Sequence, residues 1–267
     1  MGFTERPATR HLWSSRWADP GTIFEGLASD YDSFRPRYFP KAIDWLAHRP
    51  RRIADIASGT GILTRQLRSH FPDSLIVGIE PARDMLKTAS GATRGIHWLG
   101  GRAERLPLAH GTFDLVTVGQ AAHWLDRELF HAECSRVLGP GGILAILNNN
   151  RIRDSAISQA YETALENISP GYRRTYRDHV CAGELAALSH VRSVRTRRFA
   201  WVWTRTRDEW LGYVRSTSHF RAAEAHHDRE VILATIERAL APFVNEAGLL
   251  AVPYETEVTA ATFTAPT

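Results

Sequence analysis

The stretch IADIASGTG, residues 53–61, decides the fold of this chain of 267 residues. Its first part is short and mostly apolar, as a buried parallel strand requires. Gly59 and Gly61 then permit a tight turn and a close approach of a ligand to the backbone. The apolar sequence from Ile62 onward begins a helix, whose unpaired N–H groups would face the same ligand. The stretch therefore predicts a strand, a glycine turn and a helix around a binding site.

Two acidic residues accompany this turn on neighbouring predicted strands. Asp55 lies inside the apolar strand, where burial without a partner is costly. Glu80 ends the next apolar strand, where a carboxylate can accept hydrogen bonds from a ribose diol. The dinucleotide fingerprint G-x-G-x-x-G, read from Gly59, requires a third glycine where this chain has Thr64. The pyrophosphate site of an NAD(P) oxidoreductase is therefore disfavoured, although it stays an alternative.

The stretch instead resembles motif I of class I S-adenosylmethionine (SAM) methyltransferases, which reads acid-x-Gly-x-Gly-x-Gly. Asp55, Gly59 and Gly61 match this motif, whereas Ala57 replaces its first glycine. The resemblance implies a Rossmann-like α/β fold: a seven-stranded, mostly parallel sheet with helices on both faces and an antiparallel last strand. It also implies SAM as the cofactor and S-adenosylhomocysteine as its product.

The segment before residue 41 carries a second resemblance. Its pattern Tyr31-x3-Arg35-Pro36-x-Tyr38-x-Pro40 is similar to the N-terminal cap of the branch that includes trans-aconitate methyltransferase. In that branch the segment covers the cofactor. The resemblance implies that Arg35 or Tyr31 binds the amino-acid carboxylate of SAM through a charge-assisted contact. Packing of these side chains on the surface is the alternative.

Two later stretches resemble motifs of the same family. Residues 101–108, GRAERLPL, look like its Ala-Glu-x-Leu-Pro stretch, which implies that the Ala103 backbone and the Glu104 side chain address the adenine edge. Residues 119–124, GQAAHW, are similar to the Gln-Ala-x-His-Trp motif of the trans-aconitate branch. Because ligands of open α/β sheets bind at the carboxyl ends of strands, we expect this motif to border the transferred methyl group.

His123 and Trp124 are the candidate catalytic residues. His123 is either a general base or a polar residue of the wall. Trp124 either lies against the cationic sulfonium or packs in the core. Pro81 pre-sets the helix after Glu80, and Met85, one turn later, covers an adenine face or packs in the core.

The predicted cofactor-binding residues form one site at the strand ends. Within it the residues of motif I hold the methionine half of SAM, and Glu80 holds the ribose. The full predicted set comprises Tyr31, Arg35, Asp55, Ala57, Ser58, Gly59, Gly61, Glu80, Pro81, Met85, Ala103, Glu104, Gln120 and Ala121. We expect no metal.

Alternating strand and helix patterns predict a parallel sheet with right-handed crossovers. The expected strands are 53–57, 74–79, 96–99, 113–119, 142–148, 194–204 and 251–265. The expected helices are 41–48, 61–70, 82–90, 126–138, 155–168, 173–189, 207–217 and 227–241. Residues 139–142, GPGG, are expected to stop a helix and turn into the fifth strand.

Four parts follow from this order: an N-terminal helical cap over the cofactor (1–50), a SAM-binding core (51–150), a helical insertion that builds the acceptor pocket (151–193) and a C-terminal part that completes the sheet (194–267). Arginines and tyrosines of the insertion either hold an acidic or phenolic acceptor or form a solvated helix face. They are Tyr161, Tyr172, Arg173, Arg174, Tyr176 and Arg177, with His179 nearby.

Composition narrows the class of protein further. The chain is 43% hydrophobic, with net charge +4. Its densest basic cluster, 195–198, lies in an alternating aromatic segment and is expected to be a solvated strand face rather than a nucleic-acid site. The sequence contains no run of 18 apolar residues, so no membrane span is expected. It also has no apolar segment near the N-terminus of the kind that a secretory signal requires. Cys134 and Cys181 are expected to be reduced thiols in a cytoplasmic protein.

The sequence therefore predicts a SAM-dependent methyltransferase that acts on a small-molecule acceptor, such as an acidic or aromatic secondary metabolite. An enzyme that cyclises or eliminates SAM itself is the main alternative. A nucleic-acid methyltransferase is a weaker one, because the chain lacks the Asn-Pro-Pro-aromatic motif of many such enzymes. The oligomeric state is left open.

Overall fold

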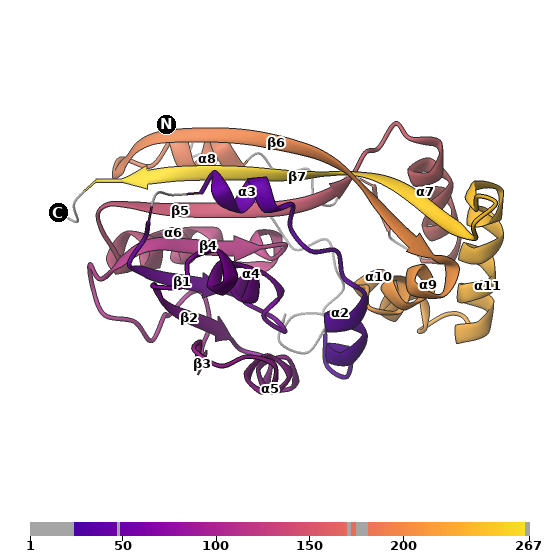
Figure 1. Cartoon of the computed structure of the whole chain (residues 1–267), viewed down its shortest axis with the longest axis horizontal. Coiled ribbons are helices and arrows are strands. Elements are labelled where there is room, and N and C mark those ends of the chain that lie inside the picture. Colours follow the sequence, from indigo (N-terminus) through magenta and orange to yellow (C-terminus); the bar gives the residue numbers. More distant parts are fainter. Residues whose placement is uncertain (1–23, 47–48, 170–171, 175–180, 265–267) are drawn as a thin grey trace, which may run out of the picture.

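The computed structural model describes residues 24–46, 49–169, 172–174 and 181–264. Its strands are β1 (Arg52–Ile56), β2 (Leu75–Glu80), β3 (His97–Gly100), β4 (Phe113–Gly119), β5 (Leu138–Arg151), β6 (Val191–Thr206) and β7 (Leu249–Phe263). They form one sheet in the order β3-β2-β1-β4-β5-β7-β6 (Figure 1). Strands β1 to β5 pair in parallel, and β7 is antiparallel to both of its neighbours. This topology confirms the predicted Rossmann-like fold.

Helices cover both faces of the sheet because successive strand residues point to opposite sides. Ile53 packs with α3 (Pro40–Asp44) and α4 (Ile62–His70) on one face, whereas Ala54 packs with α6 (Arg127–Val137) and α8 (Cys181–Ala186) on the other. The helices are α2 (Ala28–Phe34), α3 (Pro40–Asp44), α4 (Ile62–His70), α5 (Arg83–Ala92), α6 (Arg127–Val137), α7 (Ala156–Ile168), α8 (Cys181–Ala186), α9 (Arg207–Arg215), α10 (Ser218–Ala223) and α11 (Arg229–Leu240), with 3-10 turns η2 (Ala122–Trp124) and η3 (Ala241–Phe243).

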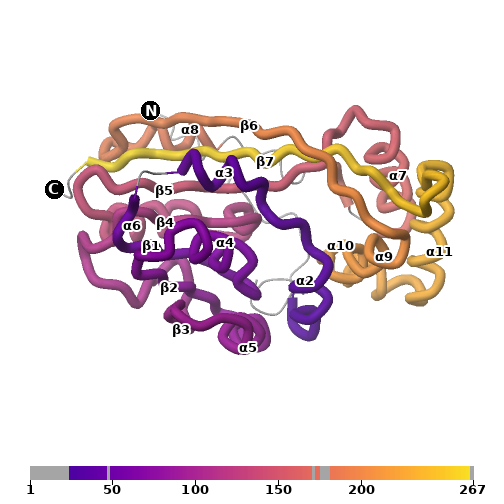
Figure 2. The backbone as a smooth tube through the Cα atoms, in the orientation of Figure 1, coloured from indigo at the N-terminus to yellow at the C-terminus, as the bar shows by residue number. Residues whose placement is uncertain are grey.

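Three strands extend well beyond the rest of the sheet. β5, β6 and β7 have 14, 16 and 15 residues, compared with four to seven in the others. Their far ends reach a separate group of helices, as the backbone trace shows (Figure 2). The helical half is the name we use for α7, α9, α10 and α11 together with the strand ends that they cover. The remainder of the described chain is the sheet half. The helical half has its own aromatic core, which includes Trp203, Trp210 and Tyr254.

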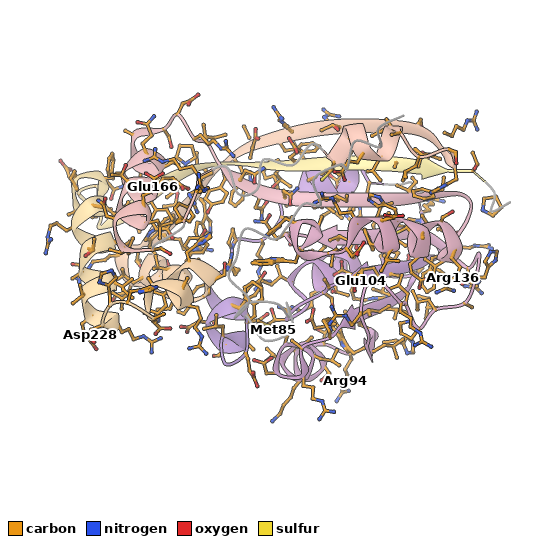
Figure 3. All side chains as sticks on the ribbon, turned by 180° about the vertical axis from the view of Figure 1, so that it is seen from behind. Met85, Arg94, Glu104, Arg136, Glu166 and Asp228 are labelled. Atoms are coloured by element: carbon orange, nitrogen blue, oxygen red, sulfur yellow. The ribbon has the colours of Figure 1, made fainter. Side chains whose placement is uncertain are left out.

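Helix α2 lies between the two halves (Figure 1). Just before it, the Gly26 N–H donates to Asp84 Oδ2 on α5 over 2.8 Å. Within it, Asp30 pairs with Arg215 of α9 at 3.0 Å. The segment that the sequence suggests as a cap therefore contacts both halves, although residues 1–23 of that predicted cap lie outside the described residues. Seen from behind, Met85 belongs to the sheet half and Asp228 to the helical half (Figure 3).

The predicted turn at residues 139–142 is wrong. These residues lie within β5, where Leu138 pairs with Phe113 and the next pair is Ile143 with Leu115. The extra residues form an irregularity of the bulge type, with Gly141 at a φ of +77°. The glycines and the proline favoured a turn in the prediction. A bulge accommodates the same residues while the strand continues.

Other boundaries also differ from the prediction. Helix α3 ends at Asp44 rather than at 48. Of the predicted helix 173–189, the described residues show only α8, and 175–180 lie outside them. The short helix α10, capped by the Thr217 side chain, is a feature that the sequence analysis missed.

Basic residues of β6 make local contacts. Arg195 donates to the carbonyls of Trp45 and Leu46, at 3.1 and 2.9 Å. Arg198 pairs with Glu257 on the adjacent strand β7 at 2.6 Å. These contacts agree with a solvated strand face whose charges are partly paired.

Candidate active site

The glycine turn after β1 is fixed by the carboxylate of Glu80, at the end of β2. Its Oε2 accepts from the Gly59 N–H at 2.8 Å, and its Oε1 accepts from the Ala82 N–H at 2.9 Å. Burial raises the pKa of Glu80, while these two backbone hydrogen bonds oppose the rise. The carboxylate therefore ties the turn to the start of the next helix and still presents its remaining lone pairs to the site.

Asp55 has the partners that its burial demands. The hydroxyls of Thr64 on α4 and Thr117 on β4 donate to its two oxygens, over 2.5 and 2.7 Å. Burial raises the pKa of Asp55 to about 6, although both hydroxyl bonds lower it. Asp55 thus joins β1, α4 and β4. Thr64, the residue that departs from the dinucleotide fingerprint, is one of the two residues that donate to Asp55.

Packing gives Gly61 a reason to be glycine in addition to the predicted approach of a ligand. It adopts a φ of +85°, and a Cβ added there would lie 2.5 Å from Cη2 of Trp98. A Cβ at Gly78 would come within 2.3 Å of the same indole. Trp98 therefore fills the space beside both glycines. Gly61 is absent from the linings of the three cavities described below, and its place in the cofactor site stays a prediction.

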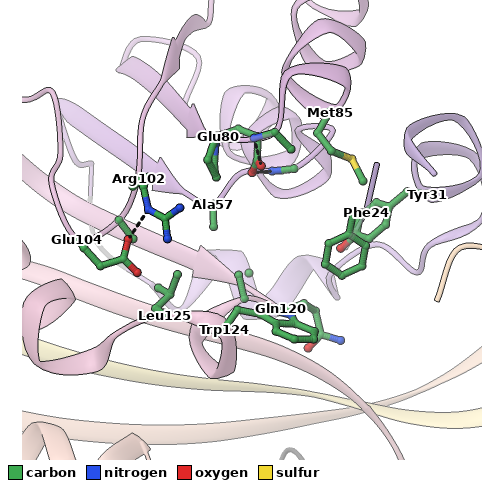
Figure 4. A pocket seen from close by; sticks show the side chains of 16 residues that line it. Phe24, Tyr31, Ala57, Glu80, Met85, Arg102, Glu104, Gln120, Trp124 and Leu125 are labelled. Atoms are coloured by element: carbon green, nitrogen blue, oxygen red, sulfur yellow. Dashed lines mark hydrogen bonds and ion pairs between the residues drawn. The ribbon is translucent and has the colours of Figure 1, made fainter. Parts of the chain in front are cut away.

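A cleft of about 740 Å³, which we call the strand-end cleft, opens at the carboxyl ends of β1, β2 and β4 (Figure 4). Most predicted site residues lie in its wall. Its lining consists of Phe24, Tyr31, Ala57, Gly59, Glu80, Pro81, Ala82, Met85, Arg102, Ala103, Glu104, Gly119, Gln120, Ala121, Trp124 and Leu125. The sequence analysis missed the contributions of Phe24, Ala82, Arg102, Gly119 and Leu125.

A second cavity of about 470 Å³, the glycine-loop pocket, adjoins the strand-end cleft and shares Tyr31, Ala57, Gly59, Gly119 and Gln120 with it. Its lining includes Asp55 and Ser58. The Ser58 hydroxyl is buried and has no hydrogen-bond partner among the described residues. The two acidic residues that the sequence singled out therefore line adjacent cavities.

Opposite ends of the strand-end cleft differ in character (Figure 4). At one end Glu104 pairs with Arg102 at 3.5 Å and accepts from the Asp126 N–H at 3.2 Å. At the other end the Phe24 ring meets Tyr31 and Trp124 edge-on, with ring centroids 5.7 and 6.0 Å apart. The cleft thus has one polar, charged end and one aromatic end.

Two residues of the wall hold a left-handed backbone without being glycine. Ala57 has a φ of +51° and Gln120 a φ of +56°. Such conformations cost roughly 1–2 kcal/mol each and gather at functional sites. Gln120 is held by a bond from its Nε2 to the Asn149 carbonyl, while its buried Oε1 has no partner among the described residues. The site therefore contains an unsatisfied acceptor on a strained turn.

A third cavity of about 440 Å³, the interlobe pocket, lies where the two halves meet. Four residues, Phe24, Tyr31, Gln120 and Trp124, line both this pocket and the strand-end cleft. The remaining lining residues are Arg35, His123, Arg151, Tyr161, Tyr213, Thr217, Ser218 and His219. His123 therefore faces the interlobe pocket, whereas Trp124 belongs to both cavities. The sequence analysis named Tyr161 but missed Arg151, Tyr213 and residues 217–219.

Other residues of the predicted insertion lie elsewhere. The Tyr172 hydroxyl bonds Glu162, and Arg174 forms a half-exposed pair with Glu166 at 2.7 Å. Neither these residues nor Arg173 lines the interlobe pocket. Tyr176, Arg177 and His179 lie outside the described residues. Arg174 lies in a turn rather than on a helix, and its ion pair is part of the surface.

Two features are absent from the described part of the chain, a metal-ligand cluster and a membrane-spanning helix. It contains no group of three or more His, Cys, Asp or Glu side chains that could hold a metal ion. None of the helices described is both long enough and apolar enough to cross a membrane. Cys134 and Cys181 are buried free thiols.

Comparison with known proteins adds to this geometry. The methyltransferase domain family matches residues 54–146, which contain the glycine turn and the ends of β2 and β4. An uncharacterized methyltransferase of Mycobacterium tuberculosis is 38% identical over 134 residues, covering 50% of this chain and 54% of the relative. A demethylmenaquinone methyltransferase of Thermus thermophilus is 33% identical over 140 residues, covering 50% and 64%. The chain thus spans about half to two thirds of the length of these relatives.

A solved structure from Anaeromyxobacter dehalogenans, provisionally named a type II methyltransferase, superposes with a TM-score of 0.63 at 21% identity and covers 88% of this chain and 100% of its own. At that identity the likeness concerns the fold alone. Sheet order, family match and sequence relatives together identify residues 54–146 as a methyltransferase domain of the class I type, whose family uses SAM.

Proposed function

We propose that the protein transfers a methyl group from SAM to a small-molecule acceptor. One observation carries the proposal: a largely apolar cleft at the strand ends, with Glu80 in its wall, shares an aromatic wall with a second, polar pocket. Two cavities with a common wall suit a reaction between two small molecules that must meet. The relatives named as methyltransferases support the same reaction class.

The residues of the strand-end cleft fit SAM. Met85, Ala103 and Leu125 offer apolar surface for adenine, and Glu80 has lone pairs for ribose hydroxyls. A Cβ at Gly59 would project into space whose nearest atom, Cε1 of Tyr31, is 3.9 Å away, so glycine keeps that space open for a ligand. In the proposal, Ser58 and Gly59 hold the methionine half, Asp55 fixes the turn behind them, and Arg35 or Tyr31 binds its carboxylate.

Positioning accounts for most of the proposed catalysis. Methyl transfer is an in-line displacement, which requires the acceptor atom about 3–3.5 Å from the methyl carbon and aligned with it. The shared wall, with Gln120 and Trp124, is where the two ligands would meet. Phe24 and Tyr31 cover this wall and would exclude water. His123, in the interlobe pocket, would act as general base or as a polar wall.

Finer points of the proposal rest on sequence motifs and on the composition of the pocket. The acceptor is an acidic or aromatic metabolite, the enzyme belongs to the trans-aconitate branch, and the segment up to residue 50 caps the cofactor. The pocket's arginine and tyrosine lining supports the first of these points. The buried free thiols, Cys134 and Cys181, support a cytoplasmic setting.

Calorimetry tests the proposal directly. Protein freed of co-purified ligand should bind both SAM and S-adenosylhomocysteine. If neither binds while NADH does, the chain is a dinucleotide enzyme and the assignment fails.

The second candidate is an enzyme that cyclises or eliminates SAM itself. It needs no acceptor, so the polar interlobe pocket would have no ligand to bind. Product analysis separates the two candidates, because methylthioadenosine would indicate elimination and S-adenosylhomocysteine would indicate methyl transfer.

A further inference from the structure

The interlobe pocket is a cationic cavity. Arg35 and Arg151 both line it, and no aspartate or glutamate is among the described residues of its wall. Arg35 donates from Nη2 to the Ser216 carbonyl at 2.7 Å, and its guanidinium carbon lies 4.6 Å from the centre of the Tyr31 ring. No carboxylate of the described residues forms an ion pair with it. The wall therefore carries positive charge that the protein does not fully compensate. Because Arg35 also lines the glycine-loop pocket, where the SAM carboxylate is proposed to bind, Arg151 is the guanidinium left for the acceptor.

Arg151 is fixed in place at the end of β5. Its Nη2 pairs with Glu162 at 2.5 Å, and its Nη1 donates to the Tyr213 hydroxyl at 2.7 Å. The guanidinium carbon lies 4.5 Å from the centre of the Tyr161 ring. The side chain is only 9% exposed. A guanidinium with this many fixed contacts is preorganised, so it loses little further freedom when it binds a ligand.

Donors in the same wall lack acceptors. The Tyr161 hydroxyl is buried and has no hydrogen-bond partner among the described residues. Nε of Arg151 and Nε of Arg35 are buried and unpaired in the same sense. Burial raises the pKa of Tyr161, so its hydroxyl keeps its proton and remains a donor. Buried donors without acceptors destabilise a protein, and they commonly mark the position of an absent partner.

We propose that the acceptor carries a carboxylate and that Arg151 and Tyr161 bind it at the end of the interlobe pocket remote from the cofactor. A carboxylate supplies only acceptor atoms, is planar, and matches the fork of a guanidinium. A phenol, the other acceptor considered above, is itself a donor and satisfies this wall less well. The inference rests on the proposed methyl transfer and names the chemistry of its acceptor.

The position of this anion site gives it the role of an anchor. Arg151 and Tyr161 line the interlobe pocket but not the strand-end cleft, whereas Phe24, Gln120 and Trp124 line both. A carboxylate at the remote end directs the rest of the acceptor toward the shared wall. The group that Arg151 binds is then distinct from the atom that is methylated.

Matched acids and amides provide the test. Short aliphatic and aromatic carboxylic acids, benzoate among them, are titrated by calorimetry into the complex with S-adenosylhomocysteine, beside their primary carboxamides. At least one acid should bind tenfold or more tightly than its amide, because the amide lacks the charge and adds a donor. If no acid outperforms its amide, or if phosphate monoesters bind and carboxylates do not, the proposal is overturned.

Variants locate the site. Tyr161→Phe removes a hydroxyl that bonds no described protein group, so the fold should persist while the preferred acid binds about tenfold more weakly. Arg151→Lys retains the charge opposite Glu162 but loses the fork, and should also weaken the acid. Arg174→Lys, in the half-exposed ion pair with Glu166 outside the pocket lining, is the matched control and should bind the acid as the parent does. If the parent and the three variants bind the acid equally, the carboxylate does not bind at this wall.

Failure of this inference is distinguishable from failure of the proposed function. If SAM and S-adenosylhomocysteine bind while no acid is preferred, only the carboxylate proposal fails. If neither nucleoside binds, the methyltransferase proposal fails first.

Discussion

The two cavities of this protein are built in different ways. The strand-end cleft draws most of its wall from residues 57–125, through turns and strand ends that are close in the sequence. The interlobe pocket gathers residues from 24 to 219, carried by α2, β5, α7 and α9. One site depends on backbone conformation and local motifs, whereas the other depends on long-range packing of side chains. A single fold thus combines a locally encoded cleft with a pocket that exists only once the whole chain has folded.

Replacement of Trp210 tests whether the two halves are also separate in stability. Its ring lies 5.0 Å from Tyr213 and 5.4 Å from Trp203, centroid to centroid, in the core of the helical half. Trp210→Ala should destabilise the protein by about 3–5 kcal/mol, because it leaves a large cavity. Since three strands run through both halves, we expect one unfolding transition in urea, with circular dichroism and fluorescence changing together.

The control is Val202→Ala on β6, where the side chain is 58% exposed. Such a surface substitution should change stability by no more than about 0.5 kcal/mol. Two separate transitions in the Trp210 variant, only one of them shifted, would show that the halves unfold independently.

The two glycines of the turn sharpen the comparison within the sheet half. Gly61→Ala combines a left-handed backbone with a contact of 2.5 Å to Trp98, so we expect a loss of roughly 2–5 kcal/mol. Gly59→Ala also places alanine in a left-handed backbone conformation, but its Cβ would lie 3.9 Å from the nearest atom, an ordinary van der Waals distance. It should therefore cost about 1–2 kcal/mol. Denaturant unfolding gives both values. An equal loss in both variants would contradict the packing role of Trp98.

Glu80 connects the turn with the proposed ligand. Glu80→Ala should weaken SAM binding by about 1–3 kcal/mol, the scale of losing a hydrogen bond to a charged group. Calorimetry measures the change, with Glu128→Ala, an exposed carboxylate on α6, as the matched control. An unchanged SAM affinity in the Glu80 variant would remove this residue from the site.

Asp55 predicts a pH dependence of stability. Its pKa is about 6 in the folded chain, against an ordinary value of 3.8, so the folded state binds the proton more tightly. The resulting stabilisation is complete below pH 3.8 and disappears as the pH rises through 6. As the pH rises from 5 to 7, the free energy of unfolding should therefore fall by about 1 kcal/mol because of this group.

Comparison with Asp55→Asn isolates this contribution. The amide is nearly isosteric and does not titrate, so the difference in unfolding free energy between parent and variant should change by that amount across the range. Asp73→Asn, at an exposed position, should show no such change. A parallel response of the parent and the Asp55 variant would contradict the assignment.

Sequence reasoning succeeded where the physical cause was local. The apolar strand around Asp55 and the glycine turn predicted β1, the turn and α4, because turn conformation and burial pattern depend on neighbours in the chain. Glu80 was found for the same reason, since parallel strands bring their carboxyl ends to one edge. Eleven of the predicted residues consequently line the strand-end cleft.

The failures have a long-range cause. Arg151 reaches the interlobe pocket only because β5 extends to fourteen residues, and no local pattern marks that length. The packing of Trp98 against Gly61 was not predicted, because the motif contains no information about a residue 37 positions away.

Ala57 gives the smallest expected effect and tests the local side of the comparison most closely. It departs from the glycine of the motif yet keeps the left-handed backbone, with a φ of +51°. Ala57→Gly relieves strain of roughly 1–2 kcal/mol but adds about 0.5–1 kcal/mol of chain entropy to be lost on folding. The net result should be a stabilisation of about 0.5 kcal/mol, measured by urea unfolding. Ala54→Gly, in the regular part of β1, should instead destabilise by about 1 kcal/mol. A clear loss of stability in Ala57→Gly would mean that its methyl group makes packing contacts worth more than the strain, so that this position, too, depends on tertiary structure.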